Sequence, residues 1–96
     1  MKLLWTNEAI NRLSEIEEYI SRDNAERAID FVSNLIEHAN ILLENPQIGR
    51  IVPELSNEQI REITYKNYRI VYRVKSEQLE ILTVFESHRL FREDEV

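Results

Sequence analysis

The hydrophobic period of this chain changes once, near its only glycine, and that change constrains the fold more than any other feature. Before Asn45-Pro46, apolar residues recur every three or four positions, as they do on one face of an α-helix. After Gly49 they alternate with polar residues, as they do along a strand. Helical segments followed by consecutive strands predict an α+β domain, with a helical hairpin packed on one face of a small, largely antiparallel sheet.

The first helix is predicted over residues 7–21, after a short apolar strand at residues 2–5. Thr6-Asn7 supplies an N-cap, and the helix then shows apolar residues at helical spacing, namely Ala9, Leu13, Ile16 and Ile20. Asp23 and Glu26 have the spacing of a capping box, so the second helix is expected to begin there. It is expected to stop before Asn45-Pro46, because proline disfavours helix in the preceding residue.

Three strands are predicted in the second half, over residues 59–65, 68–75 and 79–85, with a turn at 76–78. The middle strand has one apolar face and one mostly basic face, formed respectively by Tyr68, Ile70, Tyr72 and Val74 and by Arg69, Val71, Arg73 and Lys75. The last strand is apolar on both faces, as a central strand should be, with Leu79, Ile81 and Phe85 opposite Leu82 and Val84. The predicted order is β-α-α-β-β-β in a single domain, residues 1–96.

Composition excludes several function classes. The chain has no cysteine, which rules out disulfides, thiolate metal sites and a cysteine nucleophile. His38 lies within a helix without a second ligand at metal-binding spacing, and no phosphate-binding loop is present, so we expect no metal and no cofactor. No stretch approaches the roughly 20 apolar residues of a membrane span, and a cytoplasmic location is the simplest expectation.

Charge is unevenly distributed along the chain. The net charge of −6 arises in residues 1–58, where five Lys/Arg face eleven Asp/Glu. Between residues 61 and 75, by contrast, five cations face the single acid Glu62, which gives +4. A local basic patch on an acidic body indicates an anionic partner. The alternative is that these cations solvate one face of the sheet.

Short motifs recur along nearly the whole chain, namely Trp5-Thr6, Tyr19-Ile20, Asn45-Pro46-Gln47-Ile48-Gly49-Arg50, Val52-Pro53-Glu54-Leu55, Ile60-Arg61-Glu62-Ile63, the run from Asn67 to Val74, and Ser87-His88-Arg89. In this order and at these separations they resemble the RelE/ParE toxin superfamily, and its ParE-like members most. The resemblance implies a toxin of a type II toxin–antitoxin system that stabilises plasmids. It also implies a cognate antitoxin that wraps the hairpin and sheet, within a homodimer or a toxin–antitoxin heterotetramer.

Large aromatic side chains are candidate anchors for that antitoxin. Trp5 and Tyr65 are expected near the surface, where aromatic residues beside arginines often anchor an interface. Tyr68 and Tyr72 alternate with Ile70 and are expected in the core instead.

The superfamily divides by target, which leaves two functions open. ParE-like members poison DNA gyrase and have no known chemistry of their own, whereas RelE-like members cut messenger RNA at the ribosome. The catalytic lysines of RelE fall here on Ile60 and Glu62, and its late tyrosine has no counterpart. Only Arg69, and a basic residue near His88-Arg89, carry over from RelE.

A YoeB-like nuclease is the stronger catalytic alternative. In that subgroup a glutamate, an arginine and a histidine act together, and the matching residues are Glu54 as base, Arg69 as phosphate clamp and His88 as acid. A tyrosine that follows the histidine there is Arg89 here. The alternative is that His88 is simply a polar residue at a strand end.

Net charge favours gyrase, because a ribosome-directed nuclease gains affinity from many cations. We therefore predict a gyrase inhibitor rather than an enzyme. Its target-binding patch is expected to comprise Arg61, Lys66, Arg69, Arg73 and Arg89. A weaker alternative is an inactive or purely structural interaction module.

Overall fold

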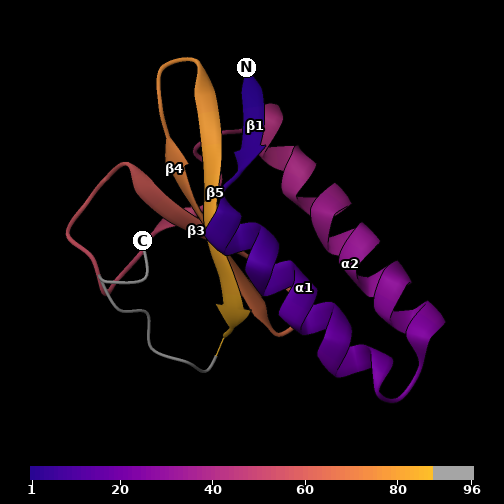
Figure 1. The fold of residues 1–96 in the computed structure, drawn as a ribbon. Helices are drawn as coiled ribbons and strands as arrows, with labels where there is room; N and C mark the ends of the chain where they lie inside the picture. The colour runs from indigo at the N-terminus through magenta and orange to yellow at the C-terminus, as the bar shows by residue number, and fades with distance from the viewer. Residues whose placement is uncertain (88–96) are drawn as a thin grey trace.

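The computed structural model describes residues 1–87 and has the predicted α+β architecture (Figure 1). Two helices lie side by side against a sheet whose strands come from both ends of the chain (Figure 1). In chain order the elements are β1 (Lys2–Trp5), α1 (Asn7–Ser21), α2 (Ala25–Ala39), the 3₁₀-helix η1 (Asn40–Leu43), β2 (Arg50–Ile51), β3 (Ile60–Tyr65), β4 (Tyr68–Val74) and β5 (Gln78–Glu86). The two-residue strand β2 was not predicted.

The strand order in the sheet is β1-β5-β4-β3-β2. β1 pairs in parallel with β5, and the remaining pairs are antiparallel. The first strand therefore lies at one edge of the sheet, beside the last strand, and β2 lies at the other edge.

A β-bulge in the β4–β5 pairing corrects one prediction about β5. Val71 pairs with Thr83, but the next residue, Tyr72, pairs with Ile81, so Leu82 is the extra residue. The extra residue reverses the alternation. Val84 therefore joins the core cluster that contains Leu79 and Ile81, while Phe85 lies in the other cluster, opposite to the prediction.

Helix α1 has the predicted bounds because its first turn is capped as expected. The Thr6 hydroxyl accepts a hydrogen bond from the Ala9 backbone N–H at 3.1 Å. The same hydroxyl lies 2.9 Å from the Ile81 carbonyl oxygen, which ties the start of the helix to β5.

Helix α2 is capped one residue later than predicted. Asn24, not Asp23, has the extended backbone of an N-cap, and its side chain accepts from the Arg27 N–H at 3.0 Å. The cap still bonds the N–H group three residues later, as predicted, but both residues lie one position further along the chain. The α-helix ends at Ala39, and η1 carries the chain on toward Asn45-Pro46.

The sheet has an apolar cluster on each face. The larger one packs under the helices and includes Leu13, Leu35, Leu42, Ile70 and Tyr72. The smaller one lies beneath the segment between β2 and β3 and consists of Val52, Leu55, Ile60, Val71, Leu82 and Phe85. Tyr68 and Tyr72 are buried, 7% and 0% exposed, which confirms their predicted core position. Neither described helix is long and apolar enough to cross a membrane.

Candidate functional site

Arg69 lies at the centre of a buried ion-pair network on the second face of the sheet. Its Nε donates to Glu62 Oε1 at 2.7 Å, while Nη1 and Nη2 donate to the two carboxylate oxygens of Glu54 at 2.8 and 2.9 Å. Glu62 comes from β3 and Glu54 from the segment between β2 and β3. Three separate parts of the chain thus meet at one guanidinium.

This network differs from a surface ion pair because its central residues are buried. Arg69 is 5% exposed and Glu62 2% exposed, and the guanidinium carbon lies 4.9 Å from the centre of the Phe85 ring. Arg50 reaches the second Glu62 oxygen, with Nε 2.6 Å from Oε2. The hydrogen bonds that Arg69 donates to Glu54 are the main cause that raises the pKa of Arg69, and Glu62 raises this pKa further, while burial acts to lower it.

The structure therefore brings two of the three predicted catalytic residues together. Glu54 and Arg69 are in direct contact, whereas His88 lies outside the described residues. Arg69 and Glu54 are hydrogen-bonded to each other. The N–H groups of the guanidinium therefore point at carboxylates rather than at an open surface. Glu62, the remaining carboxylate, has no predicted role in the sequence beyond lowering the local charge.

The predicted basic patch is divided by the fold. Arg61 Nη1 donates to the Gly49 carbonyl at 2.9 Å, and Arg73 and Lys75 lie 3.9 and 3.3 Å from the carboxylate of Glu80. Lys66 is exposed in the β3–β4 turn, and its ammonium lies 5.9 Å from the Tyr65 ring centre. Arg89 lies outside the described residues. Arg69 points into the buried network instead.

The two predicted antitoxin anchors are half-buried at separate places. Trp5 lies at the end of β1 and packs against the larger core cluster. Tyr65 lies at the end of β3, where its ring is 5.6 Å from Phe31, edge to face, and 5.1 Å from His38. Each presents part of a large side chain to solvent.

The Tyr72 hydroxyl fixes the loop that leads into β2. It donates to the Pro46 carbonyl at 2.8 Å and accepts from the Gly49 N–H at 3.0 Å. A glycine is required at position 49, because a Cβ there would lie 2.5 Å from the Glu62 carbonyl oxygen. The loop therefore packs directly on the sheet and presents Arg50 to Glu62.

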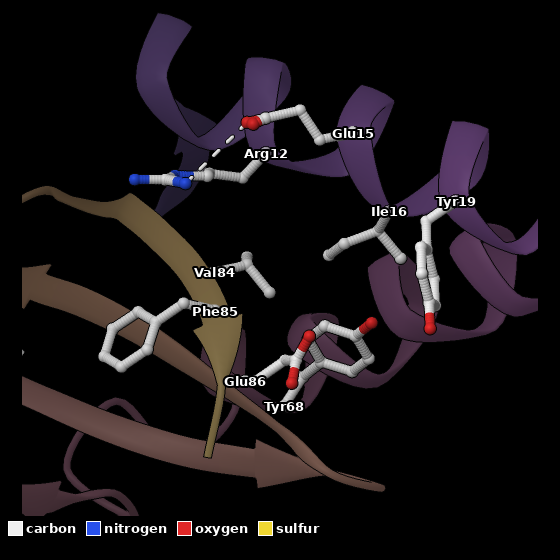
Figure 2. Close-up of a pocket in the computed structure, with 8 residues that line it drawn as sticks. All are labelled: Arg12, Glu15, Ile16, Tyr19, Tyr68, Val84, Phe85 and Glu86. Carbon is white, nitrogen blue, oxygen red and sulfur yellow. Dashed lines mark ion pairs between the residues drawn. The ribbon is translucent and has the colours of Figure 1, made fainter. Parts of the chain in front are cut away.

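A cleft that the sequence did not predict opens between α1 and the end of the β4–β5 pair (Figure 2). Its volume is about 430 Å³, and it is lined by Arg12, Glu15, Ile16, Tyr19, Tyr68, Val84, Phe85 and Glu86. Helical periodicity predicts only that Ile16 faces a sheet. That Tyr19 lies near Tyr68, the first residue of β4, depends on how the helix crosses the strands.

No cluster of three or more potential metal ligands occurs in residues 1–87. The candidate features among the described residues are therefore the ion-pair network around Arg69 and the apolar cleft beside α1.

Comparison with known proteins gives the family. Residues 3–91 match the model of the ParE toxin of the type II toxin–antitoxin system parDE. The chain belongs to the ParE toxin family. It is 34% identical over 90 residues to "Putative toxin Y4kP" of Sinorhizobium fredii, an alignment that covers 92% of this chain and 90% of that protein.

A solved structure supports the same family membership. This ParE-family chain is similar to a chain of the chromosomal ParDE toxin–antitoxin system from P. aeruginosa, with a TM-score of 0.76 and 25% identity. The match covers 90% of this chain and 95% of the other. The ParE-like resemblance noted in the sequence is confirmed.

Proposed function

We propose that this ParE-family toxin arrests bacterial growth by poisoning DNA gyrase in the cytoplasm and is neutralised by a cognate antitoxin. Membership of a toxin family and the similarity to a ParDE system support the toxin role and the antitoxin partner. The choice of gyrase as target rests mainly on one observation, the burial of Arg69 between two carboxylates.

RNA cleavage needs a cation that can contact a charged phosphate. Arg69 is the predicted clamp, but it is 5% exposed and holds Glu54 and Glu62. Breaking a buried ion pair costs about 3–5 kcal/mol, whereas a charge-assisted hydrogen bond contributes only about 1.5–3 kcal/mol. The network therefore opposes the use of Arg69 as a phosphate clamp and favours a protein target.

The charge of the remaining surface agrees with a protein target. The net charge is −6, and Arg73 and Lys75 both lie near Glu80. Counterion release gives little affinity for RNA to a surface of this kind. We propose that the exposed Lys66 in the β3–β4 turn contacts gyrase, and that Arg61 and Arg73 contribute from the opposite end of the same hairpin.

One observation favours the alternative, a ribosome-dependent messenger RNA endonuclease. Glu54 and Arg69, which are distant in sequence, lie 2.8 Å apart as a YoeB-like site would require. His88 distinguishes the two functions because only the nuclease would use its side chain as a general acid. His88→Ala should leave toxicity nearly intact in a gyrase poison and should abolish it in the nuclease.

Expression in bacteria tests the toxin role directly. Expression of the chain alone should arrest growth, and co-expression of the antitoxin encoded by the neighbouring reading frame should restore it. Normal growth at a high level of folded protein would rule out the toxin role and would favour an inactive or structural module.

A further inference from the structure

We propose that a groove at the edge of β3 binds an extended segment of the target protein, which places a carboxylate on Arg50 and an apolar side chain in the groove. This proposal rests on the proposed poisoning of gyrase, which makes gyrase the target protein. It deepens that function by naming a contact surface outside the basic patch expected from the sequence.

The groove lies between the end of the helical pair and the edge of the sheet, and its volume is about 320 Å³. Its apolar lining comes from Ile41 of η1, Ile48 of the loop before β2, and Ile63 of β3. Ile41 and Ile48 are 38% and 57% exposed, so both present apolar surface to a partner. A space of this size suits one or two apolar side chains.

The loop that carries Ile48 is fixed in place without a partner. The Tyr72 hydroxyl donates to the Pro46 carbonyl at 2.8 Å and accepts from the Gly49 N–H at 3.0 Å, while Arg61 donates to the Gly49 carbonyl at 2.9 Å. Tyr72 is 0% exposed, so the loop is anchored in the core. A preformed surface loses little conformational entropy on binding, and the exposed isoleucine of this loop is therefore well placed for recognition.

Arg50 provides an oriented cation at the rim of the groove. Its Nε lies 2.6 Å from Oε2 of Glu62, which is 2% exposed, whereas the Arg50 side chain is 66% exposed. Within residues 1–87 this is the one ion pair of Arg50, and Nη1 and Nη2 take no part in it. A guanidinium that is held through Nε and open at Nη1 and Nη2 matches a carboxylate, which can accept two parallel hydrogen bonds.

The backbone of Thr64 lies at an open edge of the sheet. β3 extends to Tyr65, but β2 pairs with it only at Arg61 and Glu62. Tyr65 pairs with Tyr68 across the two-residue turn, so alternation directs the N–H and C=O of Thr64 away from β4, toward the groove. Over residues 1–87 no backbone group pairs with them on that side. An extended segment can add there as a short strand.

The combination of these features selects a protein partner. A nucleic acid gains its affinity from many cations, whereas the groove has one open guanidinium beside three isoleucines. Backbone pairing together with a pocket for a side chain is the usual way to recognise an extended peptide segment. Charge complementarity then requires an aspartate or glutamate close to an apolar residue in that segment.

The toxin concentration that gives half-maximal DNA cleavage by gyrase tests the proposal. Arg50→Met and Ile48→Ala should each raise it about tenfold, and Arg50→Lys should recover only part of the loss because lysine lacks the planar fork. Thr64→Lys adds a cation at the rim and should lower it, more strongly at low salt. Two exposed positions on α2, outside the groove, are matched controls: Ile29→Ala and Asn34→Lys should change it by less than about twofold.

Photo-crosslinking identifies the segment that enters the groove. Ile48→p-benzoylphenylalanine should crosslink to gyrase at a segment that carries an aspartate or glutamate near an apolar residue, whereas the same substitution at Ile29 should not. Circular dichroism verifies that each variant is folded. If Arg50→Met does not fold, Ile48→Ala and Thr64→Lys decide the outcome, because both side chains are exposed.

Three results would overturn the proposal. If the wild-type toxin causes DNA cleavage by gyrase and the groove variants act at the same concentration, the groove is not the contact, although gyrase poisoning stands. Variants that bind the antitoxin more weakly but poison gyrase normally would assign the groove to the antitoxin. If the wild-type toxin causes no cleavage at all, the proposed function fails, and the assignment of the groove fails with it.

Discussion

Arg69 and Glu54 face each other in a two-pronged ion pair, with Nη1 2.8 Å from Oε2 and Nη2 2.9 Å from Oε1. The pair fastens the segment between β2 and β3 onto the second face of the sheet, above the smaller apolar cluster. Glu62 is buried behind the same guanidinium, so loss of the Arg69 charge would leave a buried carboxylate without its main partner.

Removal of the Arg69 charge should destabilise the fold strongly. Arg69→Met leaves Glu62 buried without its main cation, and the free energy of unfolding should fall by about 3–5 kcal/mol in urea denaturation. Arg73→Met is the matched control, because the Arg73–Glu80 pair is long and partly exposed, and it should cost less than about 1 kcal/mol.

The double variant Arg69→Met/Glu62→Met separates burial of an unpaired charge from loss of packing. It should be more stable than Arg69→Met alone, since no carboxylate then remains at the centre of the network. A double variant that loses the full sum of the two single effects would contradict this account of the network.

Gly49→Ala should destabilise the loop before β2. The added Cβ would lie 2.5 Å from the Glu62 carbonyl oxygen and 2.7 Å from the Tyr72 hydroxyl. We expect a cost of about 1–3 kcal/mol, as for other overpacked sites, visible as a lower Tm. Tyr72→Phe in the same chain removes only the hydroxyl clash, so it should not restore Tm. Full restoration would show that the backbone contact is unimportant.

Ionisation of Tyr72 should lower the free energy of unfolding at high pH. Burial is the main cause that raises the pKa of Tyr72 above 10.0, although the hydrogen bond from Gly49 and the charge of Arg61 oppose it. Above pH 10 the unfolded chain loses this proton more readily than the folded chain, so the free energy of unfolding declines as pH rises. Urea denaturation from pH 7 upward should show this decline.

Tyr72→Phe tests the assignment. It should cost about 1–3 kcal/mol at neutral pH, where the Gly49 N–H and the Pro46 carbonyl lose a partner. It should also flatten the decline above pH 10. An unchanged slope in the variant would place the titrating group elsewhere.

Local patterns predicted the elements of this fold well. The bounds of α1 follow from its apolar period and the Thr6 cap, and the β3–β4 hairpin follows from strict alternation on both sides of residues 66–67. The cap of α2 was one residue off, because Asp23 and Asn24 are both suitable caps. The bulge at Leu82 left no signal, since β5 is apolar on both faces and either alternation fits.

The site was less predictable because its contacts join distant segments. Glu54, Glu62 and Arg69 were each visible in the sequence, but alternation alone cannot show that two carboxylates from separate segments meet one arginine. The cleft depends likewise on where α1 crosses the strands. Tyr19 reads as an exposed residue at a helix end, and only the tertiary structure places it opposite Tyr68 (Figure 2).

The most direct test of the proposed function is incubation of the purified toxin with DNA gyrase and plasmid DNA. A gyrase poison should cause cleaved DNA to accumulate in proportion to the toxin, and prior addition of the antitoxin should prevent it. His88→Ala should retain this effect. Intact DNA and full gyrase activity, together with messenger RNA cut in the ribosomal A site, would contradict the proposal and establish the nuclease instead.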